Sequence, residues 1–103
     1  MLVGDGLEKD KIKQKIKELN FKKNIITEDW TNDPIGYLKI ADCLVFPSSS
    51  EGYGLVAMEA IAVGTPVIMT DVGVANYELK SGSKVKIVPV GDRDKFIEAI
   101  LKI

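Results

Sequence analysis

Short apolar runs alternate along the chain with longer stretches in which apolar residues recur at helical spacing. The apolar runs predict strands at residues 2–3, 24–27, 43–46, 67–69 and 85–90. The helical stretches predict helices at residues 7–19, from Pro34 onward, at 54–63, at 76–80 and after Asp92. Strands that alternate with helices at this spacing are typical of βαβ units. We therefore expect an α/β, Rossmann-like fold with a doubly wound parallel sheet of about five strands.

Single residues predict where these elements end and which faces they bury. Asp33 is expected to cap the helix that begins at Pro34, and Gly64 and Pro66 end the next helix. The continuous apolar run at residues 43–46 predicts a strand that is covered on both faces. The last helix is expected to turn these apolar side chains inward: Phe96, Ile97, Ile100 and Leu101.

Polar segments follow the predicted strands at their carboxyl ends. In open α/β sheets, ligands bind beyond those ends. The segments there are small, acidic or hydroxylic, as a polar ligand site requires. They are residues 4–6, 28–30, 47–51, 70–73 and 91–92.

Composition narrows the class of protein. The 103 residues indicate one domain over residues 1–103. A balance of 14 basic and 15 acidic side chains leaves no basic surface of the kind that binds nucleic acid. Histidine, the commonest general base and metal ligand, is absent. The single cysteine, Cys43, cannot form an internal disulfide, so a cytoplasmic protein is expected.

The sequence predicts no segment that crosses a membrane. No apolar run approaches the ~20 residues that a spanning helix needs, and the N-terminus does not resemble a signal peptide. Seven lysines lie between Lys9 and Lys23, with acidic residues among them. This pattern is typical of a solvated helix face, but a basic helix on a membrane surface also fits it. Membrane association of the full-length protein therefore stays among the expectations.

The strongest candidate for binding chemistry is a glycine-rich turn before the helix at residues 54–63. Gly52 and Gly54 flank Tyr53, and glycine permits a tight turn and close approach of a ligand to the backbone. The turn leads into a helix N-terminus, whose free N–H groups and positive dipole end attract phosphate. The segment therefore predicts a binding site for a diphosphate.

Glu59 stands out because every other residue from 55 to 63 is apolar, which predicts a buried helix. A buried carboxylate is costly unless it is hydrogen-bonded or paired. The vicinal hydroxyls of a sugar would supply such bonds, and so would a lysine or a neighbouring backbone group; the residues alone do not choose between them. Glu51 lies eight positions earlier, at the mouth of the turn. The two carboxylates could hold the two ends of a nucleotide sugar.

The segment from Pro47 to Ile68 resembles the signature of the group 1 glycosyltransferases, which are retaining, nucleotide-sugar-dependent enzymes with the two-domain GT-B fold. Its core reads Glu-Gly-Tyr-Gly-Leu-Val-Ala-Met-Glu, and Glu51 and Glu59 are its paired acids. Other segments are similar to the family as well: residues 3–6, 41–48, 70–73 with Glu78, and 85–92. The resemblance covers nearly the whole chain and implies the C-terminal, donor-binding domain of such an enzyme.

The resemblance implies a role for each matching residue. Glu51, as the catalytic residue, would contact hydroxyls of the transferred sugar, and Glu59 would bind the ribose hydroxyls. Ser48 would approach the nucleoside. The backbone N–H groups implied to bind the sugar and diphosphate belong to Gly52, Tyr53, Gly54 and Leu55. The donor would be a UDP-, GDP- or ADP-sugar, and the sugar would pass to an acceptor hydroxyl by front-side displacement, with no enzyme nucleophile and no obligatory metal.

The chain also departs from the family pattern. It begins after the family's first strand and after the loop whose arginine and lysine neutralise the diphosphate; Arg93 cannot replace them by position. We therefore expect a donor domain truncated on its N-terminal side, without its acceptor domain and inactive alone. Without the first strand, the sheet would either close in the order 2-1-3-4-5 or leave open edges that favour dimerisation. Gly73-Val74 replaces the pair of glycines that the family often has.

The alternative from another class is a non-catalytic nucleotide-binding or interaction module with a flavodoxin-like fold. A signalling receiver domain is disfavoured, because Pro47-Ser48 stands where its phospho-accepting aspartate would end the third strand. A dinucleotide site at Gly4-Asp5-Gly6 is not expected either, because Lys9 occupies the third glycine position. Titration with nucleotide sugars distinguishes the donor-binding hypothesis from the hypothesis of a non-catalytic module.

Overall fold

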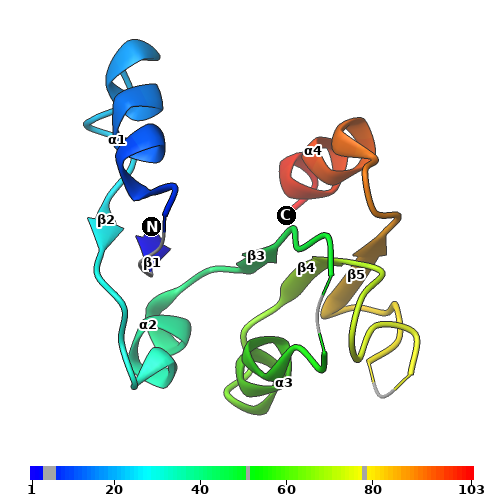
Figure 1. Cartoon of the computed structure of the whole chain (residues 1–103). Helices are drawn as coiled ribbons and strands as arrows, with labels where there is room; N and C mark the ends of the chain where they lie inside the picture. Colours follow the sequence, from blue (N-terminus) through cyan, green and yellow to red (C-terminus); the bar gives the residue numbers. More distant parts are fainter. Residues whose placement is uncertain (4–6, 51, 78) are drawn as a thin grey trace. The chain divides into compact units, whose positions relative to one another are not determined.

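The structure, a computed structural model, describes residues 1–3, 7–50, 52–77 and 79–103. The chain divides into two compact units, Met1–Asn32 and Asp33–Ile103, whose elements are labelled in Figure 1. The prediction of one domain over residues 1–103 stays a prediction. Those predictions that concern Gly4-Asp5-Gly6, Glu51 and Glu78 lie outside the described residues.

The first unit contains a parallel pair of strands and one helix. β1 (Leu2–Val3) pairs with β2 (Thr27–Glu28), with Leu2 opposite Thr27. α1 (Lys9–Glu18) buries none of its residues. The ammonium group of Lys9 lies 2.5 Å from the carboxylate of Asp29, so an ion pair joins the start of α1 to the residue after β2.

β2 begins later than the apolar pattern predicts, since the expected strand covered residues 24–27. The N–H groups of Asn24 and Ile25 both donate to the Phe21 carbonyl, at 2.9 and 3.0 Å. These residues therefore form a turn, and their N–H groups are not available to a strand ladder. The strand starts only at Thr27.

The second unit is built on a parallel sheet of three strands in the order β3-β4-β5. The strands are β3 (Leu44–Phe46), β4 (Val67–Thr70) and β5 (Val85–Val88). The helices of this unit are α2 (Pro34–Ile40), α3 (Leu55–Ala62) and α4 (Arg93–Leu101). Asp33 and Asp92 stand at the predicted N-cap positions of α2 and α4, and the Asp92 carboxylate accepts a hydrogen bond from the Lys95 N–H at 3.0 Å. β5 ends at Val88, directly before Pro89, as predicted.

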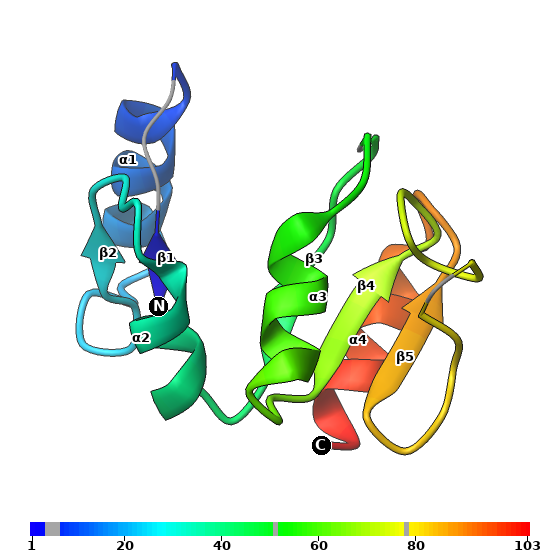
Figure 2. The ribbon, with the colours of Figure 1, turned by 90° about the horizontal axis from the view of Figure 1, so that it is seen from below.

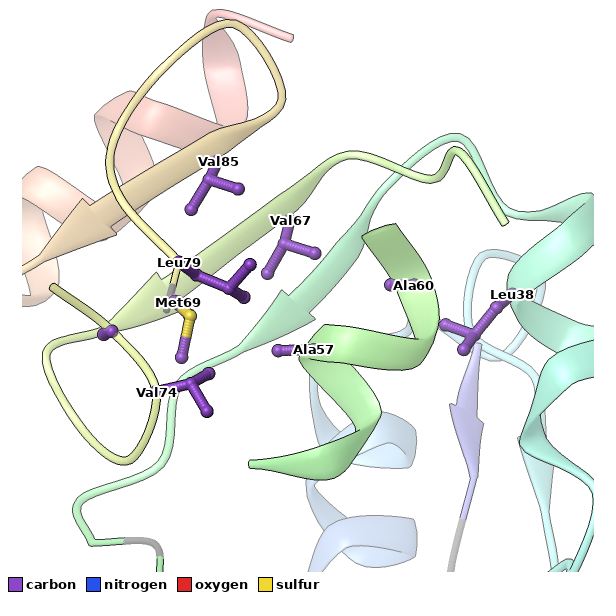
Figure 3. Close-up of a cluster of buried hydrophobic side chains, with 9 residues drawn as sticks. Leu38, Ala57, Ala60, Val67, Met69, Val74, Leu79 and Val85 are labelled. Carbon is purple, nitrogen blue, oxygen red and sulfur yellow. The ribbon is translucent and has the colours of Figure 1, made fainter. Parts of the chain in front are cut away.

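β4 is the centre of this sheet and contributes side chains to both of its faces. Val67 and Met69 pack with α3, where Ala57 and Ala60 are fully buried; Figure 3 shows the side chain of Ala57 directed toward Met69 and Val74. Ile68 points to the other face and packs with Phe96 and Ala99 of α4. Helices thus cover both faces of the sheet, above and below the strands in Figure 1, which is the layering expected of a doubly wound fold.

The buried face of α4 is narrower than predicted. Phe96 is buried as expected, with 9% of its surface exposed, and Ala99 is the second buried residue of the helix. The prediction was wrong for three residues that lie mostly at the surface: Ile97, Ile100 and Leu101. α4 packs on β4 and β5 (Figure 2), and a helix on the face of a sheet buries only the residues on the side that meets the strands.

β3 is less covered than its apolar run predicts. Leu44 and Phe46 pack against the core on the α3 side. Val45 points to the opposite face and keeps 41% of its surface exposed. Since α4 lies on β4 and β5, it does not cover this part of the sheet as it covers Ile68.

The described residues of the range 76–80 do not form the expected helix. Asn76 adopts a left-handed backbone conformation, with φ of 63°, which interrupts a right-handed helix. The Asn76 N–H donates to the Leu79 carbonyl at 2.7 Å, and Ala75 forms an isolated bridge with Leu79. These bonds close a compact loop after β4 and bury Leu79 in the core.

The five predicted strands are present, and each pairs in parallel with its neighbour. They form two sheets, in the orders β1-β2 and β3-β4-β5. The order 2-1-3-4-5, in which β1 and β3 would be neighbours, stays a prediction, because β1 and β3 belong to different units.

Candidate functional site

The candidate site lies where β3 and β4 end, because two loops leave the same edge of the sheet there. Phe46 is opposite Met69 in the parallel register, so the chain leaves β3 and β4 at the same level. The loop after β3 includes the glycine-rich turn and leads into α3; the loop after β4 covers residues 71–79. The edge that the sequence predicted for ligands is therefore the edge at which both loops meet.

Two hydrogen bonds join these loops. The Thr70 hydroxyl donates to the Ser48 carbonyl at 2.5 Å, across 22 positions of the sequence. The Val74 N–H donates to the Tyr53 carbonyl at 2.8 Å. The end of β4 and the loop after it therefore hold the glycine-rich turn at both of its ends.

Gly54 shapes the start of α3. It has a φ of 87°, in the left-handed region that glycine adopts at little cost, and it is buried. Its carbonyl accepts the first helical hydrogen bond, from the Ala57 N–H at 3.1 Å. Because Gly54 has no side chain that could cap the helix, the N–H groups of Leu55 and Val56 have no partner among the described residues and are left for solvent or a ligand.

Gly73 is the residue of closest approach between the two loops. Its φ is 55°, and a Cβ atom built on it would lie 2.3 Å from the Tyr53 carbonyl oxygen. No side chain fits there without moving the turn. The next residue, Val74, is buried in the core, where its side chain lies near Gly54. Val74, which stands in place of the second glycine of the family's pair, thus adds a side chain to the core.

Glu59 lies on α3, four positions after Leu55 and therefore on the same side of the helix. Its side chain is half-buried, and within the described part of the chain it makes no hydrogen bond or ion pair. The lysine or backbone partner that the sequence left open is therefore not found among those residues. Since the rise of a helix is ~1.5 Å per residue, the carboxylate is held roughly two turns or less from the turn at Gly54.

α3 is less buried than its sequence predicts. Ala57 and Ala60 face the sheet and are fully buried, whereas Leu55 keeps 63% of its surface exposed. The sheet and α2 pack against α3, but they do not bury the helix all round. Glu59, on the side of Leu55, is therefore only partly covered.

The structure brings several predicted site residues together. Ser48, Tyr53 and Gly54 meet the end of β4 through the two hydrogen bonds and the packing described above. The side chains of Tyr53 and Leu55 are exposed, and Gly52 is exposed as well. The position of Glu51 lies outside the described residues. The assigned roles stay predictions.

Sequence reasoning gave no role to Thr70, although it lies in one of the segments predicted to leave a carboxyl end. The sequence also did not predict that the Asn76 side-chain amide donates to the Asp71 carboxylate, at 3.0 Å. Asparagine in a left-handed conformation is a known turn former, and this was the one local signal for the loop.

Three further properties of the described residues bear on the site. Cys43 is a free, half-buried thiol, and burial raises its pKa above the ordinary value. Across the described ranges, no three side chains of the usual metal-binding types gather in a way that could hold an ion. None of the helices in those ranges has the length and apolar character to cross a membrane.

The chain was compared with known proteins. A family model described as "Glycosyl transferases group 1" matches residues 1–103. The Escherichia coli UDP-Gal:alpha-D-GlcNAc-diphosphoundecaprenol alpha-1,3-galactosyltransferase is 31% identical over 104 residues, which cover 100% of this chain and 27% of that protein. The lipopolysaccharide core biosynthesis glycosyltransferase LpsE of Rhizobium meliloti is 31% identical over 102 residues, which cover 99% of this chain and 30% of that protein. The chain thus spans less than a third of the length of these relatives.

The fold agrees with solved structures of glycosyltransferases. The crystal structure of TarM matches with a TM-score of 0.88 at 25% sequence identity, over 98% of this chain and 20% of that chain. This confirms the predicted α/β, Rossmann-like fold as part of a GT-B architecture. Together with the family match over residues 1–103, it shows that this chain belongs to the group 1 glycosyl transferases.

Proposed function

We propose that this chain binds a nucleotide sugar, as the donor-binding part of a retaining glycosyltransferase that transfers the sugar to an acceptor hydroxyl. One observation supports this most directly. The Glu59 carboxylate is half-buried in an apolar helix and has no partner in the described part of the protein, so it is available to paired hydroxyls of a ligand. A carboxylate in such a place is costly unless something binds to it.

The proposed roles follow the arrangement of the turn. The backbone N–H groups at Gly52, Tyr53, Gly54 and Leu55 bind the sugar and the diphosphate. The uncapped first turn of α3 supports the diphosphate through its N–H groups and dipole. Glu59 binds the ribose hydroxyls, and Ser48 approaches the nucleoside. Glu51 contacts the transferred sugar as the proposed catalytic residue.

The proposed reaction needs no nucleophile from the protein. The acceptor oxygen forms a bond to the anomeric carbon on the face from which the diphosphate departs, and the bond between that carbon and the diphosphate oxygen breaks. The departing diphosphate takes the acceptor proton. Because the new bond forms on the face that the leaving group vacates, the anomeric configuration is retained. The protein contributes positioning and electrostatic stabilisation of the leaving group, and we propose no metal cofactor.

The donor and the setting of the whole protein are also proposals. The Escherichia coli relative is named for a UDP-Gal donor and a diphosphoundecaprenol-linked acceptor. Its name supports a UDP-sugar as the first donor to test, before GDP- and ADP-sugars, and it supports membrane association of the whole protein. The free thiol of Cys43 fits a cytoplasmic setting. β3 pairs on one edge only among the described strands, which supports dimerisation through the sheet.

Titration of the 103-residue chain with UDP-, GDP- and ADP-sugars, followed by NMR chemical shifts, tests the proposal. We expect millimolar binding that perturbs residues 48–60. A hydrogen bond to a charged group contributes about 1.5–3 kcal/mol, so Glu59→Ala should weaken binding at least tenfold. The control is Glu98→Ala, on the exposed face of α4. Absence of binding at millimolar ligand would contradict the proposal and favour a degenerate or truncated scaffold.

A further inference from the structure

We propose that Thr70, at the end of β4, and Gly73, in the loop after it, are positioning residues for the donor-binding turn. This inference rests on the proposed function, because it assigns to these two residues the task of orienting the backbone at Ser48, which approaches the nucleoside, and at Gly54, whose N–H binds the donor. Neither side chain is proposed to touch the ligand. Each acts through a peptide group of the turn.

Thr70 fixes the peptide between Ser48 and Ser49, at the start of the loop that leads into the glycine-rich turn. Only 5% of its surface is exposed, and its hydroxyl donates to the Ser48 carbonyl at 2.5 Å. In a planar trans peptide the carbonyl and the following N–H point in opposite directions. Because the Ser48 carbonyl is directed at Thr70, the N–H of Ser49 points away from β4.

Gly73 fixes the last peptide of the turn. The Tyr53 carbonyl is directed at the loop after β4, where the Val74 N–H donates to it at 2.8 Å. A Cβ atom on Gly73 would lie 2.3 Å from this carbonyl oxygen and 2.7 Å from its carbon, so the peptide can sit here only because position 73 has no side chain. The N–H of Gly54 is thereby turned away from β4, toward the side on which α3 begins.

The first bond starts from β4 itself, and the second starts from the loop that directly follows it. β4 is the central strand of the β3-β4-β5 sheet, and each of its residues is buried. The turn, in contrast, is rich in glycine and serine, which do not restrict the backbone by themselves. Preorganised N–H groups bind an anion better than mobile ones, because no ordering is needed when the ligand arrives. The support from β4 therefore raises the affinity for the donor.

The chain offers a matched control for Thr70. Thr65, just before β4, is also buried, and its hydroxyl also donates to a backbone carbonyl, that of Leu38, at 2.6 Å. The two threonines make the same kind of bond at opposite ends of one strand. Replacement by valine removes the hydroxyl and keeps the shape in both cases, so Thr65→Val and Thr70→Val should destabilise the fold to a similar extent.

Gly73 has a matched control in Gly64. Both have a positive φ, of 55° and 87°, so alanine is strained at either position. A Cβ atom on Gly64 would meet only the flexible end of Lys84, at 3.9 Å. Gly64→Ala therefore tests the effect of backbone strain alone, whereas Gly73→Ala tests the strain together with the collision against the Tyr53 carbonyl.

The experiment measures UDP-galactose affinity and thermal unfolding for the 103-residue chain and these variants. We expect Thr70→Val to weaken binding about tenfold, Thr70→Ser to restore it, and Thr65→Val to leave it unchanged. Gly73→Ala should weaken binding more than Gly64→Ala does at equal loss of thermal stability. Wild-type affinity in Thr70→Val would overturn the inference while the proposed function stands.

A second measurement keeps the two proposals separate. The amide N–H directions of Ser49 and Gly54 can be measured without ligand, by residual dipolar couplings in labelled protein. We expect the coupling of Ser49 to change in Thr70→Val and that of Gly54 to change in Gly73→Ala, with neither changed in Thr65→Val. If wild-type protein binds no nucleotide sugar, the proposed function fails, and unchanged couplings in the variants would then overturn the positioning inference on its own terms.

Discussion

Replacing Glu59 by methionine tests whether this carboxylate serves binding rather than folding. The residue lies in the middle of α3, between buried Ala57 and Ala60, and its side chain is half-buried without a protein partner in the described residues. Glutamate and methionine have nearly equal helix propensities. The change in stability should therefore come from the side chain's surroundings alone, and we expect the variant to be more stable than the wild type.

The magnitude follows from the half-buried state of the side chain. Full burial of a methionine side chain stabilises a protein by about 1.5–3 kcal/mol, so half of that burial contributes about 1 kcal/mol. Removal of a charge that is partly withdrawn from water acts in the same direction. We expect the free energy of unfolding to rise by about 1–2 kcal/mol. For a unit of this size, each kcal/mol raises the midpoint temperature of thermal unfolding by about 4–8 °C.

Urea and thermal unfolding at pH 7, followed by far-ultraviolet circular dichroism, provide the measurement. Glu98→Met is the control, because Glu98 is an exposed residue of α4 that pairs with Lys102 at 2.9 Å and gains little from an apolar side chain. The same samples are titrated with UDP-galactose, and only Glu59→Met should lose binding. A lower free energy of unfolding in Glu59→Met would refute the reasoning, because it would show that the carboxylate has a structural partner.

Two further predictions concern the remaining elements. Phe96→Ala should lower the free energy of unfolding by about 3–5 kcal/mol in a urea titration, since the ring is buried against β4 and β5. Leu101→Ala, at a residue that is 79% exposed, should change this free energy little. Equal losses in the two variants would contradict the position of α4. The hydrogen bond from Lys9 lowers the pKa of Asp29, so the stabilisation by this pair should be present above the pKa of the unfolded chain and be lost as the pH falls through the lower, folded value. Carbon-detected NMR titration should show the Asp29 midpoint moving up in Lys9→Ala, and an unmoved midpoint would argue against the ion pair.

The order and type of the elements could be predicted because their signals are local. Alternation of apolar runs with helical spacing is enough to identify parallel βαβ units, and caps such as Asp92 are read from one or two residues. The errors have physical causes that lie beyond such windows. Ile100 and Leu101 satisfy a helical apolar pattern, but α4 rests on the face of the sheet with only the side of Phe96 and Ala99. Val45 belongs to an apolar run, yet the neighbouring helix covers other strands.

The loop after β4 shows the same limit at a smaller scale. Residues 76–80 have helix-forming composition, but Asn76 adopts a left-handed conformation that is stabilised by bonds to Leu79 and Asp71. These partners are close in sequence, and asparagine is one of the few residues that accept this conformation readily. The turn could therefore have been predicted if the asparagine had been given more weight than the helical pattern.

Glu59 and Thr70 show why one half of the candidate site can be predicted from the sequence and the other half cannot. Glu59 breaks a local rule, since it places a charge in an apolar helix, and residues that break local rules without compensation are concentrated at functional sites. Thr70 breaks none, because threonine is an ordinary residue at the end of a strand. Its importance comes from a hydrogen bond across 22 positions of the sequence, which exists only once β3 and β4 have paired. A group proposed to bind a ligand, such as the Glu59 carboxylate, can therefore be recognised in the sequence because it does not suit its apolar neighbours. A group proposed to orient the backbone, such as the Thr70 hydroxyl, suits its neighbours. Only the folded sheet distinguishes such a group from other core residues.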